Sequence, residues 1–196
     1  MIYFIPWVIS SVALVLSVLG WGQDFGWHFY GFTLYEWFPL FGLIAFSLMW
    51  AHYAVDFVSR FGKFKFDESY LFATRYIVLF ALLLHPGLLA LQLWREGFGL
   101  PPMSWLSFIG PDLQWAIIVG LCAWLAFLLF ELHRWFRGKS WFRWIVLANA
   151  GAMVAVVIHV LYVAEPLGWF RNLWYLYGIS LIIFLIKELY DYRTSK

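Results

Sequence analysis

The sequence predicts an all-α, polytopic membrane protein: a bundle of six transmembrane helices with both termini in the cytoplasm. Composition gives the first indication, because the 196 residues are 64% hydrophobic and only 12% charged. A soluble domain carries about 25% charged residues, so this chain falls outside that class. The net charge is +2, and the basic residues are confined to a few segments. That pattern is typical of membrane topology and gives no indication of a nucleic-acid partner.

Six apolar runs supply the second observation. Crossing the hydrocarbon core as a helix takes about 20 mostly apolar residues. Runs of that kind occupy residues 2–20, 37–58, 70–94, 113–133, 141–163 and 170–190. They use most of the chain and leave no room for a soluble domain, so we expect a single transmembrane domain over residues 1–196. Its main partner is then the lipid bilayer.

The distribution of basic residues is the third observation and predicts the orientation. Arg95 and Arg171 lie on one side of the expected bundle. The remaining Lys and Arg lie on the other side: Arg60, Lys63, Lys65, Arg75, Arg134, Arg137, Lys139, Arg143, Lys187, Arg193 and Lys196. The positive-inside rule therefore places the N- and C-termini in the cytoplasm, with the protein in a plasma or bacterial inner membrane.

Two histidines stand inside the apolar runs. His85 lies about 22 Å along the third run and His159 about 27 Å along the fifth, both measured outward from the cytoplasmic end. Two parallel helices thus present one imidazole each at a similar depth in the outer leaflet. Imidazole nitrogen is a good iron ligand, so the pair predicts the axial ligands of a haem. The alternative is that each histidine hydrogen-bonds to a neighbouring helix.

A second polar set lies toward the cytoplasm. His52 and Asp56 are one turn apart on the second run, Arg75 is early in the third, and Glu131 is late in the fourth. These side chains could line an inner pocket for a flavin or a quinone, or a proton path. The alternative is a structural ion-pair cluster at the membrane boundary.

The third run, "ATRYIVLFALLLHPGLLALQLW", and the fifth, "WFRWIVLANAGAMVAVVIHVLYV", resemble the ferric reductase-like transmembrane domain superfamily. That superfamily includes ferric reductases, NADPH oxidases, the STEAP metalloreductases and the haem-binding subunit of the bacterial methionine sulfoxide reductase system. The resemblance covers roughly residues 37–190. It implies that His85 and His159 are the axial ligands of a haem b.

The chain departs from the two-haem members of that superfamily. Those members carry a second histidine about 14 residues, or one leaflet, before each outer ligand. Here Leu71 and Ile145 occupy those positions, and neither side chain can ligate iron. The resemblance therefore implies one outer haem, as in the STEAP proteins, where a flavin occupies the inner region.

The sequence thus predicts a membrane haem b electron-transfer subunit, an oxidoreductase component. It contains no dinucleotide-binding fingerprint, so electrons are expected from a cytoplasmic reductase or from quinol. They would leave through the haem to an acceptor or redox partner on the outer side. One alternative is a transporter or proton-conducting protein that uses His52, Asp56, Arg75 and Glu131. Another is a haem-free scaffold with the same fold.

Overall fold

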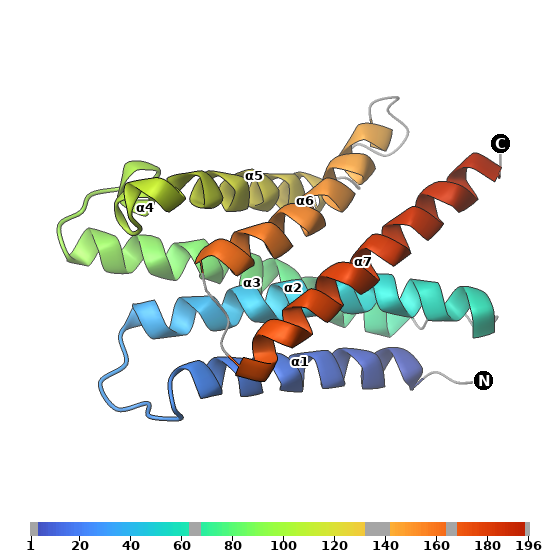
Figure 1. Cartoon of the computed structure of the whole chain (residues 1–196), viewed down its shortest axis with the longest axis horizontal. Helices are drawn as coiled ribbons and strands as arrows, with labels where there is room; N and C mark the ends of the chain where they lie inside the picture. The colour runs from blue at the N-terminus through green and yellow to red at the C-terminus, as the bar shows by residue number, and fades with distance from the viewer. Residues whose placement is uncertain (1–3, 63–67, 132–141, 164–167, 195–196) are drawn as a thin grey trace. The chain divides into compact units, whose positions relative to one another are not determined.

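The computed structural model describes residues 4–62, 68–131, 142–163 and 168–194, and everything described is helix, turn or loop (Figure 1). The helices are α1 (Ile5–Asp24), α2 (Leu34–Gly62), α3 (Glu68–Arg95), α4 (Met103–Ser107), η1 (Pro111–Leu113), α5 (Gln114–Glu131), α6 (Phe142–Val163) and α7 (Gly168–Thr194). The prediction of an all-helical chain is confirmed for this part of the sequence.

Within the described ranges, five stretches are long and apolar enough to cross a membrane: Ile5–Asp24, Leu34–Arg60, Ser69–Arg95, Pro111–Glu131 and Phe170–Lys187. The apolar part of α6, Leu147–Val163, is shorter. Five such helices make the chain an integral, multi-pass membrane protein. A sixth span remains a prediction.

The surface of the helices also fits lipid. On α3, large apolar side chains such as Phe72 and Phe80 are more than half exposed. On α7, Leu176, Ile179 and Ile186 are exposed in the same way. Apolar surface of this extent is rare on monomeric soluble proteins, and hydrocarbon would cover it. Lipid therefore accounts for the apolar side chains that are not buried in the protein core.

The orientation of the chain remains a prediction. Several of the basic residues on which it depends lie outside the described residues, namely Lys63, Lys65, Arg134, Arg137, Lys139 and Lys196.

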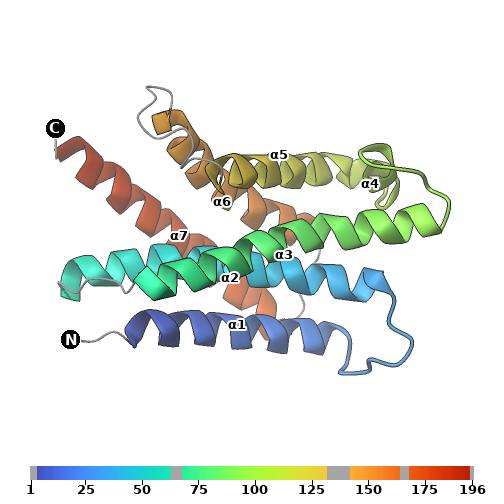
Figure 2. The ribbon, with the colours of Figure 1, turned by 180° about the vertical axis from the view of Figure 1, so that it is seen from behind.

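The contacts divide the chain into two compact units, Met1–Pro111 and Asp112–Lys196. In the first unit α2 packs against both α1 and α3, and α3 also contacts α4 (Figures 1 and 2). In the second unit α6 packs against α5 and α7. The helices α2 and α3 form one antiparallel pair, and α5 and α6 form another.

Small and hydroxyl side chains bring α1 close to its neighbours. Ser10, Ala13 and Ser17 recur at helical spacing on one face of α1 and are buried. The Ser17 hydroxyl donates to the carbonyl of Ala13 at 3.0 Å, so its hydrogen bond with Ser47 of α2 is donated by Ser47. Small residues allow close approach of helices in lipid, and hydroxyl pairs add specific contacts.

The segment between α3 and α5 has more structure than the sequence indicated. This segment falls between the third and fourth predicted runs, and the structure shows the short helices α4 and η1 there. Neither is long enough to give an apolar run that a pattern search would detect. The segment closes over the start of α2, where the ring of Phe108 stacks on Tyr35 with 5.5 Å between centroids.

Candidate functional site

His85 lies on α3, half-buried, against the first turns of α2. Its Nδ1 is 2.8 Å from the carbonyl oxygen of Phe38. A carbonyl oxygen only accepts, so the imidazole Nδ1–H is the donor. A neutral ring with its proton on Nδ1 has its lone pair on Nε2, the nitrogen that a metal would bind. The Phe38 ring also packs beside the imidazole, with centroids 5.3 Å apart.

His159 has the same arrangement in the second unit. It lies on α6, half-buried, and its Nδ1 is 2.8 Å from the carbonyl oxygen of Ala116 on α5. Again the donor is Nδ1–H, and the lone pair of the neutral ring is on Nε2. Backbone carbonyls are common partners of metal-ligating histidines, because the bond fixes both the tautomer and the orientation of the ring.

Both bonds lie at corresponding ends of their helix pairs. Phe38 and Ala116 are in the first turns of α2 and α5. His85 and His159 are in the later parts of α3 and α6, the helices that return antiparallel to them. Each histidine is therefore bonded to a neighbouring helix, as the alternative interpretation of the sequence expected. The bonds use Nδ1, which is compatible with ligation through Nε2.

The two histidines belong to different units, His85 to the first and His159 to the second. Among the described residues, no group of three or more His, Cys, Asp or Glu side chains could hold a metal ion. A haem differs from such a site, because the porphyrin supplies four nitrogens and the protein needs to add only axial ligands.

Within the polar set expected near the cytoplasmic side, His52 has an uncharged partner. His52 Nε2 lies 2.7 Å from the hydroxyl of Thr74 on α3. That hydroxyl donates to the carbonyl of Tyr70 at 2.7 Å, so Nε2–H of His52 must be the donor to Thr74. The hydroxyl of Tyr70 in turn bonds with Ser10 of α1 at 2.8 Å. His52 thus belongs to a hydrogen-bond network that joins α1, α2 and α3.

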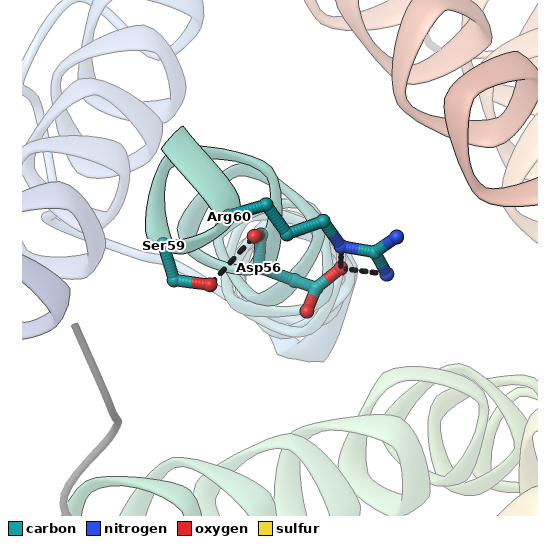
Figure 3. A network of polar contacts seen from close by, with 3 residues as sticks. All are labelled: Asp56, Ser59 and Arg60. Carbon is teal, nitrogen blue, oxygen red and sulfur yellow. Dashed lines mark hydrogen bonds and ion pairs between the residues drawn. The ribbon is translucent and has the colours of Figure 1, made fainter. Parts of the chain in front are cut away.

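Asp56 has a partner on its own helix. Its carboxylate accepts from Arg60 one turn later, with Nη2 at 2.6 Å and Nε at 2.9 Å (Figure 3). Its backbone carbonyl accepts from the Ser59 hydroxyl at 2.7 Å. The Asp56 side chain is 47% exposed, so this ion pair sits at the surface of the unit.

The other two members of the predicted set are placed as follows. Arg75 is half-buried on α3, directly after Thr74. Glu131 is the last residue of α5 and belongs to the second unit, whereas the other three belong to the first. The structure brings His52 together with Thr74, and Asp56 together with Arg60.

Reasoning from the sequence missed the partners that hold the histidines. The carbonyls of Phe38 and Ala116 give no side-chain signal. Thr74 and Tyr70 do give one, because hydroxyls four residues apart on an apolar helix share one face.

Comparison of the chain with models of protein families, with curated proteins and with solved structures finds no match.

Proposed function

We propose that the protein is a membrane haem b electron-transfer subunit in which His85 and His159 are the axial ligands of one haem. The observation that carries the proposal is the pair of Nδ1–carbonyl bonds, each 2.8 Å long. They give two imidazoles the same tautomer, with the lone pair on Nε2. A histidine that only joined two helices could use either nitrogen. The same choice at both histidines is what two equivalent ligands require.

The order of the helices supports a shared depth. The two histidines lie in the later parts of α3 and α6, beside the starts of α2 and α5. If six helices cross the membrane alternately, the ends of the third and fifth crossings lie at the same face. His85 and His159 then occupy the same leaflet, whichever way the chain is inserted. With the termini cytoplasmic, that leaflet is the outer one.

The apolar composition of the helices that carry the two histidines also suits such a group. A porphyrin is large, flat and mostly apolar, and it can fill space between the helices of a bundle. When bound, haem supplies one-electron transfer. The chain supplies the two ligands, the orientation of each ring and a surrounding of low dielectric. These contributions tune a haem for electron transfer rather than for the activation of small molecules.

The direction of transfer follows from the same proposal. Electrons would come from a cytoplasmic reductase or from quinol and leave to an acceptor or redox partner outside. Gly42 of α2 lies beside the His85 ring, and it is ten residues before His52. A flavin or quinone near His52 would therefore lie about 15 Å along α2 from the level of His85. The resemblance of the third and fifth apolar runs of the sequence, now α3 and α6, to the ferric reductase-like superfamily is the reason for this assignment.

The alternative of a transporter or proton path has weaker support. A transport or proton path needs polar side chains that can pass a proton or a substrate from one to the next. His52 instead holds Thr74, and Asp56 holds Arg60 at the surface. Both arrangements are typical of structural contacts between and along membrane helices.

Substitution of the ligands tests the proposal. We expect His85→Ala and His159→Ala to lose the haem from protein purified in detergent, measured as the ratio of haem to protein. His28→Ala is the control, because His28 lies in the exposed connection between α1 and α2 and should keep the haem. Retention of haem at the wild-type ratio in both ligand variants would overturn the assignment.

A further inference from the structure

Two glycines lie in close contact with the imidazole rings of the two histidines. A β-carbon built on Gly42 would stand 2.8 Å from both Nδ1 and Cε1 of His85. A β-carbon built on Gly120 would stand 2.5 Å from Nδ1 and 2.7 Å from Cε1 of His159. Real β-carbons essentially never approach other atoms this closely. Each imidazole therefore occupies the space that any other residue would fill with its own side chain.

Each glycine lies one helical turn after the carbonyl that holds the same ring. Gly42 follows Phe38 by four residues on α2, and Gly120 follows Ala116 by four residues on α5. Residues four apart share a face of a helix, so the carbonyl and the bare Cα form one surface. We call this surface the imidazole seat. It appears once in each unit, on the first helix of an antiparallel pair, with the histidine on the second.

The seat also fixes which edge of the ring faces away. In both cases the three atoms nearest the glycine are Cγ, Nδ1 and Cε1. The opposite edge, which contains Nε2, is then directed away from the helix that carries the seat. Glycine elsewhere on these helices does not produce such contact: a β-carbon on Gly87 of α3 or Gly151 of α6 would meet nothing within 4 Å.

We propose that Gly42 and Gly120 are positioning residues, which seat the two ligand histidines in the same tautomer with Nε2 turned away from the supporting helix. The proposal rests on the function proposed above. There, one haem iron takes an axial ligand from each histidine, so two equivalent ligands, and hence two seats, are needed. It assigns a role to two residues that are not ligands.

The direct test is the spectrum of the alanine variants. We expect Gly42→Ala and Gly120→Ala to push the imidazole off its carbonyl. Loss of such outer contacts typically weakens metal binding roughly 10- to 100-fold. The purified variants should contain less haem, and what remains should be high-spin. Gly87→Ala is the control on α3. Gly178→Ala on α7 is the packing control, because its β-carbon would touch Val157 of α6 at 3.2 Å and no histidine.

A second measurement needs no haem and shows whether loss of haem reflects general misfolding. In haem-free protein, Gly120→Ala should lower the midpoint of thermal unfolding, because the new methyl group meets the ring of His159. In the His159→Ala background the ring is gone, and the same change should raise the midpoint, since alanine favours helix over glycine. The same pair of measurements applies to Gly42→Ala and His85→Ala.

The outcomes separate the two proposals. Wild-type haem content and a low-spin spectrum in both glycine variants would overturn the positioning role while leaving the haem assignment intact. A wild-type protein without haem would overturn the assignment, and the unfolding midpoints would still test the seat. Equal shifts of the midpoint with and without the histidine would overturn the seat itself.

Discussion

The imidazole of His159 and the backbone of Ala116 meet at 2.8 Å across α6 and α5, the same distance that separates His85 from Phe38. Neither bond involves a charged partner. An imidazole bonded to a neutral carbonyl remains a neutral ligand, whereas a carboxylate partner would raise its basicity further. The two rings should therefore be electronically similar.

This relationship predicts that free imidazole can replace the missing side chain. We expect His159→Gly, like His159→Ala, to lose its haem during purification. Adding haem together with free imidazole should restore a low-spin spectrum, because the seat on Ala116 and Gly120 still accepts a ring. Titration with imidazole, followed by absorption, measures the effect. A low-spin spectrum that does not return would show that the seat on α5 does not receive a free ligand.

The network around His52 predicts an effect on stability rather than on haem. Thr74→Val keeps the shape of the side chain and removes the hydroxyl that accepts from His52 and donates to Tyr70. Hydrogen bonds between membrane helices contribute about 0.6 kcal/mol on average and at most about 1.7 kcal/mol. We expect a loss of that order in the free energy of unfolding, measured by denaturation in detergent, with haem content unchanged.

Asp56→Asn is the matched comparison on the same helices. Its ion pair with Arg60 is exposed, and pairs of that kind contribute about 0.3–0.5 kcal/mol. The change should therefore have a smaller effect than Thr74→Val. If Thr74→Val removed haem without lowering stability, the hydrogen bonds of His52 would support haem binding and not only the packing of α2 against α3.

A contact outside the spans predicts a dependence on pH. Glu96 follows α3 and accepts hydrogen bonds from the Tyr35 hydroxyl and from Gln92, the latter at 2.7 Å. The bond from Tyr35, followed by that from Gln92, holds the pKa of Glu96 below its ordinary value of 4.5. A carboxyl whose pKa is lowered by folding stabilises the protein above that ordinary value. The contribution disappears as the pH falls through the lowered pKa.

Removing the hydroxyl should reduce this effect. In Tyr35→Phe the pKa of Glu96 should rise toward 4.5, because the largest cause of its shift is lost. The difference in unfolding midpoint between wild type and variant should be present near neutral pH and shrink below pH 4.5. Thermal unfolding at a series of pH values measures this. A difference that persists unchanged at the acid end would mean that the Tyr35 hydroxyl does not act through the charge of Glu96, because the variant keeps the ring that stacks on Phe108.

The helices could be predicted from the sequence because one physical requirement dominates their composition. In hydrocarbon, backbone groups must be satisfied within the helix, so long apolar runs become helices. The runs containing His85 and His159 correspond to α3 and α6 within a few residues. The short helices α4 and η1 could not be foreseen, because five and three residues give no periodic pattern.

The two imidazole seats could not be predicted from the sequence, for a different reason. Their acceptors are backbone carbonyls, which every residue carries, and their other component is the absence of a side chain. The spacing differs as well: His85 follows Phe38 by 47 positions, and His159 follows Ala116 by 43. A search for repeats compares side chains at fixed spacing, and here only a glycine and a histidine recur. Three-dimensional contact was needed to relate them.

The most direct test of the central claim is the absorption spectrum of the wild-type protein, purified in detergent with ample haem during expression, first oxidised and then reduced with dithionite. The account predicts the sharp reduced bands of a low-spin b-type haem, at about one haem per chain, as expected for two imidazole ligands. A colourless protein would contradict it, and so would a haem whose spectrum shows that only one axial position is filled by the chain.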